Sequence, residues 1–332
     1  MPRNQLLRDW IARQYPGESL DIQPASADAS FRRYFRLQFA DERPSLIVMD
    51  APPGHEDCRP WLKVGALFAA AGVHVPRVLA QDLELGFLML SDLGNTTYLA
   101  VLNQDNAPAL YGEALTALVR IQQASQPGVL PAYDRPLLER ELDLFPDWYV
   151  NKHLGKTLTP AQEKVWQTAK EKLLANVLAQ PQGYVHRDYH SRNLMVSDPN
   201  PGIIDFQDAV YGPLTYDPVS LFRDAYISWE EEQELDWVIR YWELARRAKL
   251  PVPAAFDDFY RDYEWMGAQR QLKVLGIFAR LYHRDGKDGY LADMPRVMAY
   301  LRRTCERYGE LRPLWRLLEE LEPSVSQVGY TF

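Results

Sequence analysis

The feature that most constrains this chain is a short β-rich segment, residues 184–206, in a sequence whose later part is otherwise helical in pattern. Two apolar runs, 194–196 and 203–206, flank the turn sequence Asp-Pro-Asn-Pro-Gly, and this arrangement predicts a β-hairpin. Asn193 and Asp205 stand at equal distances from the middle of the turn. We therefore expect the hairpin to bring their side chains together.

The residues before the hairpin form a second pattern, His-Arg-Asp-Tyr-His-Ser-Arg-Asn at 186–193. Four residues separate Asp188 from Asn193, and this spacing matches the catalytic loop of kinases. A carboxylate there can orient an attacking hydroxyl group and accept its proton, and amide and carboxylate oxygens suit Mg²⁺. The pattern predicts Asp188 as the catalytic base, and Asn193 with Asp205 as ligands of the Mg²⁺ that accompanies ATP.

Each of these features alone has an ordinary explanation. An Asp with an Asn five positions later is common by chance, a turn rich in Pro is typical of any hairpin, and His186 can equally be a packing residue beneath the loop. Asp208, Tyr211 and Asp217, just downstream, are weaker candidates, and Asp217 can instead hold the loop or cap a helix. The combination at this spacing is what favours a phosphoryl-transfer site.

The periodicity of apolar residues divides the chain into two parts. The first part is mostly β in pattern, with strands expected at 31–39, at 45–50 and twice between 75 and 90, and helices at 3–15 and 57–71. The second part is mainly helical, with amphipathic helices at 107–124 and 159–178 and further helices from Trp229 onward. Thr159, Pro160 and Gln162 fit a capping box. We predict an α+β fold with a β-rich nucleotide-binding lobe, 1–93, and a helical lobe with the catalytic hairpin and the substrate site, 94–332.

With these motifs the sequence resembles the aminoglycoside phosphotransferase-like kinase superfamily, which also includes choline and homoserine kinases. More narrowly, it is similar to the bacterial sugar kinases of cell-wall recycling, which act on N-acetylmuramate and N-acetylglucosamine. The segments that carry the narrower likeness are SADASFRRYFRL (26–37), LIVMDAPP (46–53), GVHVPRVLAQD (72–82), LMLSDLGNTTYL (88–99) and RELDLFPDWYV (140–150). The resemblance implies a two-lobed, protein-kinase-like fold, ATP and Mg²⁺ as cofactors, and an amino-sugar substrate. It also implies that the product is the sugar α-1-phosphate, formed in peptidoglycan recycling.

Two departures from the kinase pattern concern the ATP phosphates. Small residues at 25–30, among them Ser30, replace the expected Gly-rich loop, and Met49 stands near the position of the ATP-binding Lys. The helix expected next offers no Glu to pair with such a Lys. Another cation must then steady the phosphates, and we expect Arg32 or Arg33 to do so, with Arg32 preferred. The alternative is that both arginines are solvated strand residues.

The resemblance also places the adenine ring at the junction of the two lobes. Backbone groups between Ser91 and Leu93 would bond the edge of the ring, and Met89 and Leu90 would form apolar walls of the pocket.

The sugar is expected to bind on the helical lobe, facing Asp188. In segment 140–149, Glu141 can bind sugar hydroxyl groups and Trp148 can stack on a sugar face. Together with Phe145, however, these residues have the spacing of one helix face, so a role in the core is an equally good interpretation.

Basic and acidic residues near the catalytic loop are further candidates for sugar contacts. His190 and Arg192 lie within the loop and could meet the lactyl carboxylate of N-acetylmuramate. Asp208 and the basic segment 269–273 are the remaining candidates.

Composition excludes several other classes of function. The net charge of −8 argues against a general nucleic-acid binder, which needs a large basic surface. The longest nearly apolar stretch, Val64–Val75, falls short of the roughly 20 residues of a membrane span, and the polar N-terminus lacks a secretion signal. The two isolated cysteines form neither a disulfide framework nor a zinc cluster, so we expect a cytoplasmic protein. No obligate protein partner follows from the sequence.

Three alternatives stay open at this point. The substrate could be another small hydroxylated molecule, such as an aminoglycoside, an amino alcohol or homoserine. A protein kinase is disfavoured, because no Ala-Pro-Glu motif follows Asp205 and Asp217-Pro leaves little room for an activation loop. A nucleotide-binding regulator without catalysis fits the missing Lys, but such a protein would be free to lose Asp188 and Asn193.

Overall fold

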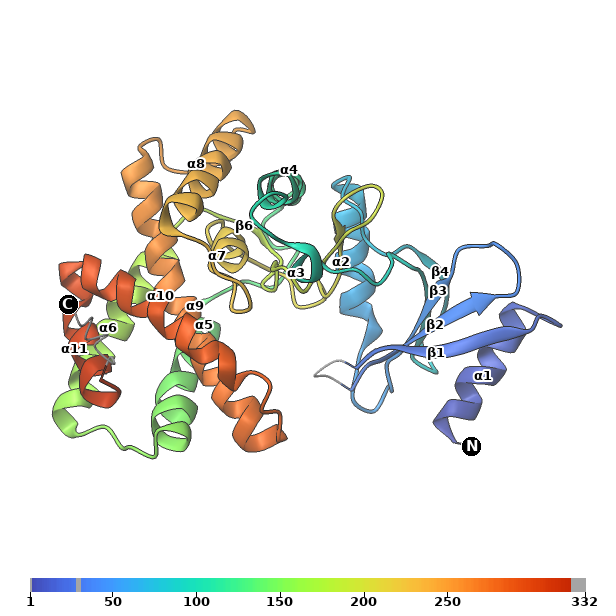
Figure 1. The fold of residues 1–332 in the computed structure, drawn as a ribbon, viewed down its shortest axis with the longest axis horizontal. Helices are drawn as coiled ribbons and strands as arrows, with labels where there is room; N and C mark the ends of the chain where they lie inside the picture. The colour runs from blue at the N-terminus through green and yellow to red at the C-terminus, as the bar shows by residue number, and fades with distance from the viewer. Residues whose placement is uncertain (1, 28–30, 324–332) are drawn as a thin grey trace, which may run out of the picture. The chain divides into compact units, whose positions relative to one another are not determined.

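The computed structural model describes residues 2–27 and 31–323 (Figure 1). It contains a five-stranded antiparallel sheet near the N-terminus and a mainly helical remainder, so the predicted α+β class is confirmed. No helix in the described parts of the chain is long and apolar enough to span a membrane.

The chain forms two compact units, each built from two segments. The first comprises Met1–Ala124 and Arg192–Ala209, and the second comprises Ser125–Ser191 and Val210–Phe332. This division differs from the predicted lobes, because the residues that follow position 93 and those of the catalytic hairpin make their contacts mainly within the first unit. The functional division at residue 93 stays a prediction.

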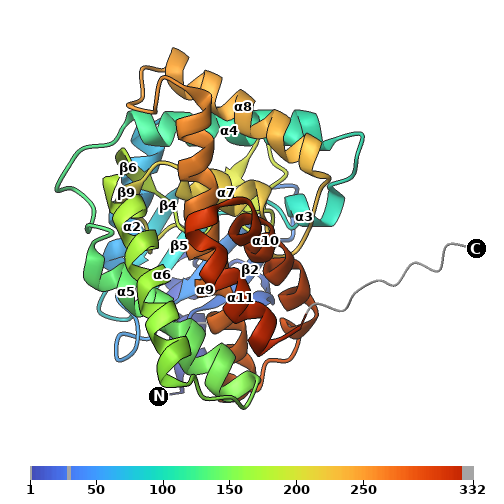
Figure 2. The ribbon, with the colours of Figure 1, turned by 90° about the vertical axis from the view of Figure 1, so that its left-hand side faces the viewer.

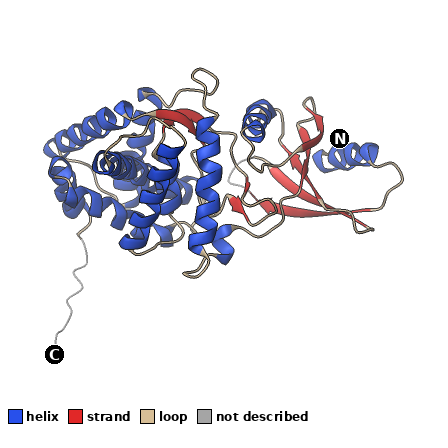
Figure 3. Ribbon diagram, turned by 90° about the horizontal axis from the view of Figure 1, so that it is seen from above, coloured by secondary structure: helices blue, strands red, loops and turns tan. Residues whose placement is uncertain are grey.

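The first unit is organised around its sheet, whose strands are coloured red in Figure 3. The strand order is β1-β2-β3-β5-β4. The strands are β1 (Leu20–Ala27), β2 (Arg33–Phe39), β3 (Leu46–Asp50), β4 (Val78–Asp82) and β5 (Phe87–Ser91). The helices are α1 (Arg3–Gln14), α2 (Cys58–Ala70), α3 (Tyr98–Val101) and α4 (Ala107–Gln123), and the hairpin strands are β7 (Leu194–Met195) and β8 (Gly202–Ile203).

Alternation along the strands gives this sheet two apolar faces. On one face, α1 packs Leu7 and Trp10 against Leu37, Val48 and Met89. The residues one position along each strand, such as Met49 and its partner Leu88, therefore point to the opposite face. The buried, continuous apolar runs of β3 and β5 follow from this two-sided burial.

The sequence did not predict β1. This strand lies at the sheet edge, and its pairing with β2 shifts register between Pro24 and Ser26. Proline is tolerated at an edge or a bulge because it donates no ladder hydrogen bond. The alternation of apolar and polar residues along β1 is therefore interrupted where the strand bends, and the sequence pattern does not indicate a strand there.

The second unit is a group of helices around one long helix, α9 (Phe256–Asp285), which Figure 2 shows among its neighbours. It contacts α5, α6, α7, α8, α10 and the π-helix η1. The neighbours are α5 (Arg135–Leu144), η1 (Phe145–His153), α6 (Pro160–Ala179), α7 (Tyr216–Phe222), α8 (Glu231–Arg247), α10 (Met294–Arg307) and α11 (Arg312–Leu321). Two 3-10 turns, η2 (Leu291–Asp293) and η3 (Gly309–Leu311), and a two-stranded sheet of β6 (Gln182–Val185) and β9 (Val210–Pro213) complete the unit.

Several expected helix ends are confirmed. Helix α6 begins with the predicted capping box, in which the Thr159 side chain accepts from the backbone of Gln162 and the Gln162 side chain accepts from the backbone of Thr159. Helix α2 is followed by Gly72 in the left-handed region, at φ +76°. Both ends follow from local chemistry that the sequence carries.

Candidate active site

The predicted hairpin forms, and it brings Asn193 and Asp205 together as expected. Leu194 pairs with Ile203, and the backbone N–H of Ile204 donates to the Asn193 carbonyl over 3.1 Å. The Asn193 side-chain amide lies 3.2 Å from the Asp205 carboxylate. The register is offset by one residue from the predicted one, so that Asn193 stands opposite residue 204. The left-handed backbone of Asp205, at φ +63°, accompanies its approach to Asn193.

Aromatic packing fixes the strand that carries Asp205. The next residue, Phe206, is fully buried, and its ring centroid lies 5.0 Å from that of Trp61 and 5.8 Å from that of Phe68, both on α2. Gly65, also on α2, permits this contact, because a Cβ there would lie 3.3 Å from the Phe206 ring. Helix α2 therefore determines where Asp205 stands.

The catalytic loop belongs to the second unit, where two buried aspartates hold its ends. Asp217, on α7, accepts the backbone N–H groups of His186 at 2.7 Å and Arg187 at 3.0 Å. Asp224, just after α7, accepts both the N–H of Ser191, at 2.9 Å, and its hydroxyl, at 2.5 Å. The suggestion that Asp217 holds the loop is confirmed. Asp188 lies between the two anchored ends.

The backbone of the catalytic loop, which these two aspartates hold, is strained at one residue. Arg187, directly before Asp188, has a φ of +76° in the left-handed region, which costs free energy for a residue other than glycine. The two hydrogen bonds to Asp217 offset this cost. Burial raises the pKa of Asp217 to about 7, against the lowering effect of the two N–H donors.

A group of positive charges controls the ionisation of Asp188. Burial acts to raise the pKa of this carboxyl, but Lys273 first, and then the two histidines and Arg187 of the loop, outweigh burial and hold the pKa below its usual value. Lys273, on α9, donates to the Tyr216 hydroxyl over 2.8 Å and lies 3.1 Å from the Glu141 carboxylate. Asp188 is therefore ionised at neutral pH, as a hydrogen-bond acceptor for a hydroxyl group must be.

Glu141 connects this group to α5. Its carboxylate pairs with Arg187 and Lys273 and accepts a hydrogen bond from the Tyr133 hydroxyl. The positive charges lower the pKa of Glu141 although burial opposes this. With Asp188 included, two carboxylates face the two cations Arg187 and Lys273, and this balance of charge favours the observed position of the loop arginine.

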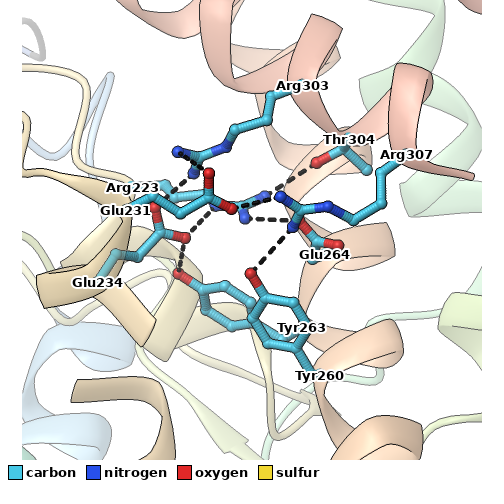
Figure 4. Close-up of polar contacts among 9 residues, drawn as sticks. All are labelled: Arg223, Glu231, Glu234, Tyr260, Tyr263, Glu264, Arg303, Thr304 and Arg307. Atoms are coloured by element: carbon cyan, nitrogen blue, oxygen red, sulfur yellow. Dashed lines mark hydrogen bonds and ion pairs between the residues drawn. The ribbon is translucent and has the colours of Figure 1, made fainter. Parts of the chain in front are cut away.

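A second ionic network, shown in Figure 4, fixes the end of α7 next to Asp224. Arg223 is buried, and its guanidinium lies 2.6 Å from Glu234 on α8, 2.9 Å from Glu264 on α9 and 3.0 Å from the Thr304 hydroxyl on α10. The network is completed by further residues of the same three helices: Glu231, Tyr260, Tyr263, Arg303 and Arg307. Three arginines thus meet three glutamates, so the network carries no net charge.

Comparisons with known proteins show the family to which the chain belongs. A family model described as "Phosphotransferase enzyme family" matches residues 21–259. The chain belongs to this phosphotransferase family. Among curated relatives, an N-acetylmuramate/N-acetylglucosamine kinase of Neisseria meningitidis serogroup B is 53% identical, and the match covers 100% of both chains. A kinase of the same name from Pseudomonas aeruginosa is 54% identical over 91% of this chain and 88% of the relative.

Among solved structures, an ADP-bound aminoglycoside phosphotransferase superposes with a TM-score of 0.56 at 14% identity, over 89% of this chain and 96% of that one. At this identity the likeness concerns the fold alone. It confirms the predicted kinase-like fold for this phosphotransferase.

The oxygen atoms at the hairpin fit the Mg²⁺ that such phosphotransferases are expected to use. An amide oxygen and a carboxylate are hard ligands of the kind that Mg²⁺ takes, usually with phosphate and water oxygens completing the octahedron. Within the described residues no group of three or more His, Cys, Asp or Glu side chains could form an all-protein metal site. The Asn193 and Asp205 pair therefore suits a metal ion that arrives with a nucleotide.

The phosphate-binding candidates of this phosphotransferase already have acidic partners. Arg32 lies 3.3 Å from Glu56, and Arg33 pairs with the fully buried Asp50. Met49, at the position of the usual Lys, is fully buried. The predicted roles of Arg32 and Arg33 stay predictions, and Ser30 lies outside the described residues.

The adenine-site candidates lie at the end of β5. The Met89 side chain belongs to the core beneath α1, so Leu90 is the one that points to the opposite face of the sheet. The Ser91 hydroxyl accepts the N–H of Arg77 over 2.9 Å, and Leu93 is buried. The backbone contacts predicted for Ser91 and Leu93 do not depend on these side-chain directions and remain predictions.

The sugar-site candidates are dispersed. Glu141 is occupied by the protein partners described above, and Trp148 is half-buried in η1. His190 is half-buried, with its ring 5.4 Å from that of Tyr226. Arg192 and Asp208 are exposed residues of the first unit. Sugar contacts by these residues remain predictions.

Sequence reasoning gave little weight to two residues that matter for the loop. Lys273 was included only as part of segment 269–273, because its proximity to Asp188 depends on how α9 packs. Asp224 was not identified at all, since nothing in its sequence neighbourhood distinguishes it. The structure shows its role, because Asp217 and Asp224 are buried at the two ends of α7.

Proposed function

We propose that this phosphotransferase is an ATP-dependent kinase that phosphorylates the 1-hydroxyl group of N-acetylmuramate and N-acetylglucosamine to the α-1-phosphate. The observation that carries the proposal is the match, over nearly the whole chain, to relatives with that name at 53% and 54% identity. The proposal gives the protein a role in peptidoglycan recycling. Because ATP is the donor, we place the reaction in the cytoplasm.

In this proposal Asp188 orients the sugar hydroxyl and accepts its proton. Its anchored loop keeps the carboxylate in one position, and its lowered pKa keeps it ionised at neutral pH. A base positioned in this way contributes about 10²–10⁴-fold to the rate. The same low pKa makes Asp188 a weak base, so its main contribution is to align the hydroxyl for in-line attack.

In this proposal the hairpin residues contribute to the binding of the nucleotide. Asn193 and Asp205 would hold Mg²⁺, which when bound neutralises charge on the phosphate oxygens. The packing of Phe206 against α2 would keep Asp205 in place as the nucleotide binds. The ADP-bound relative of the same fold supports the use of an adenine nucleotide.

Phosphorus NMR of the purified protein with MgATP and each sugar in turn tests the proposal. We expect a new sugar-1-phosphate resonance with both sugars, which reports the reaction and the phosphorylated position together. The Asp188→Asn variant should lower the rate by about 10²–10⁴-fold. Asp236→Asn, which alters an exposed carboxylate on α8, serves as the matched control and should leave the rate unchanged.

The same experiment can reject the proposal. If the protein binds ATP but transfers phosphate to neither sugar, the hypothesis of an amino-sugar substrate is wrong. Amino alcohols, homoserine and aminoglycosides would then be tested as substrates. ATP binding without transfer to any of these would favour a regulator. Near-normal turnover by Asp188→Asn would show that Asp188 is not the base.

A further inference from the structure

Arg280, in the C-terminal half of α9, is half-buried. Its Nε atom is inaccessible to water and has no hydrogen-bond partner among the described residues, a feature that it shares with Arg270. Within the described residues, no carboxylate lies at ion-pair distance from its guanidinium. Asp285, a nearby carboxylate on α9, is held by Arg284 through two hydrogen bonds of 2.7 and 2.9 Å.

This environment favours an anion as a partner for Arg280. Burial lowers the pKa of the guanidinium, and the neighbouring Arg284 lowers it further. Both effects mean that the charged form lacks the compensation a half-buried arginine usually has, and a bound anion would supply it. A carboxylate is a good match, because it can accept two parallel hydrogen bonds from a guanidinium.

The position of Arg280 connects it with the catalytic loop. Residues 273, 276 and 280 lie on one stripe of α9, and Arg280 stands two turns beyond Lys273, about 10.5 Å along the helix axis. Lys273 is the cation that contributes most to lowering the pKa of Asp188. A ligand whose reacting hydroxyl lies at Asp188 would therefore have to span about two turns of α9 to reach Arg280.

Ring contacts also link the loop to this level of α9. His190, two residues after Asp188, contacts Tyr226 at 5.4 Å between ring centroids, and Tyr226 contacts Phe278 at 6.2 Å. Phe278 is only two residues before Arg280. Within the second unit, the catalytic loop therefore lies near the part of α9 that includes Arg280.

The π-helix η1 flanks the same stretch of α9. A Cβ at Gly276 would lie 2.5 Å from the backbone of Leu144, at the start of η1, and His283 contacts His153, at its end. Trp148, in the sequence midway between these two contacts, is half-buried. π-Helical turns occur frequently at functional sites. An aromatic ring of η1 and a cation of the adjacent α9 suit a sugar that carries an acid.

Several other cations near Asp188 have protein partners. Lys273 and Arg187 both pair with Glu141, and the buried Arg270 donates one hydrogen bond to a serine hydroxyl of α7 over 2.9 Å. Of the two proposed sugars, N-acetylmuramate alone carries a carboxylate, on its lactyl ether. We propose that Arg280 binds this lactyl carboxylate and thereby determines the affinity of the enzyme for N-acetylmuramate relative to N-acetylglucosamine, an inference that rests on the proposed function.

Steady-state kinetics with both sugars tests the inference. In Arg280→Gln, kcat/KM for N-acetylmuramate should fall by about 10- to 100-fold, mainly through KM, because a charged hydrogen bond made in the ground state is lost. For N-acetylglucosamine, kcat/KM should stay within about twofold. Arg280→Lys, which keeps the charge, should retain an intermediate preference. Arg240→Gln, which alters an exposed arginine on α8, is the matched control and should leave both sugars unaffected.

A second measurement separates binding of the carboxylate from a structural effect. The carboxamide of N-acetylmuramate has the same shape but no charge. The wild-type enzyme should prefer the acid over the amide, and Arg280→Gln should lose that preference.

An equal loss for both sugars, no loss for either, or an unchanged acid preference in Arg280→Gln would overturn the inference while leaving the proposed function intact. A wild-type enzyme that phosphorylates neither sugar would remove the proposed function, and this inference with it.

Discussion

At the scale of single residues, Lys273 should determine the pH at which Asp188 becomes active. Asp188 must be ionised to accept a hydrogen bond from the sugar, so the acidic limb of the pH profile of kcat/KM reports its protonation. Lys273 lowers the pKa of Asp188, which keeps the carboxylate ionised to lower pH. Lys273→Met removes that charge, so the pKa should rise and the acidic limb should move to higher pH.

Lys273→Arg is the control for this prediction, because it retains the positive charge and should leave the limb near its wild-type position. If Lys273→Met lowers the plateau of the profile but leaves the limb in place, Lys273 acts only by supporting Glu141 and Arg187. Measuring kcat/KM across pH for the three proteins distinguishes these outcomes.

The residues themselves show what could be predicted from sequence. The proximity of Asn193 and Asp205 was predictable because it depends on a hairpin of local residues, whose turn chemistry is visible. Lys273 lies 85 positions after Asp188, and Arg280 still further, so their proximity to the loop depends on how α9 packs. No local pattern encodes such long-range contacts, so the residues around the sugar could not be identified from the sequence alone.

At the scale of elements, the ionic network around Arg223 should hold α7 in place. Arg223→Met leaves Glu234 and Glu264 with only the partly exposed Arg303 and Arg307 as cationic partners, and the network would carry a net negative charge. Loss of one partner from a buried ion cluster costs about 3–5 kcal/mol. We therefore expect a lower free energy of unfolding by about this amount, measured by denaturant titration.

Arg240→Met is the matched control for Arg223, because it breaks an exposed i,i+4 pair with Asp236 on α8. Such pairs contribute about 0.3–0.5 kcal/mol. A loss below about 1 kcal/mol for Arg223→Met would show that the network is not what fixes α7.

Helix ends with capping chemistry were predictable at this scale, whereas the π-helix was not, since its wider turn has no distinct apolar period.

At the scale of the whole molecule, the chain places its proposed base and its proposed metal ligands in different compact units. Asp188 belongs to the second unit, and Asn193 and Asp205 belong to the first. The short catalytic loop and the hairpin after it therefore pass from one unit to the other. This division predicts that nucleotide binding and proton acceptance can be impaired separately.

Thermal unfolding with and without nucleotide tests that separation. A ligand at about 100 times its Kd stabilises the folded state by roughly 2.7 kcal/mol, so MgATP should raise Tm, and removal of Mg²⁺ with EDTA should abolish most of the rise. Asp205→Asn should lose the Mg²⁺-dependent part, because the carboxylate that holds the ion is gone. Asp188→Asn should keep it, although turnover is lost, because Asp188 holds no metal. If Asp205→Asn kept the full Mg²⁺-dependent rise, the hairpin would not be the metal site, and the assignment of the nucleotide to the first unit would have to be revised.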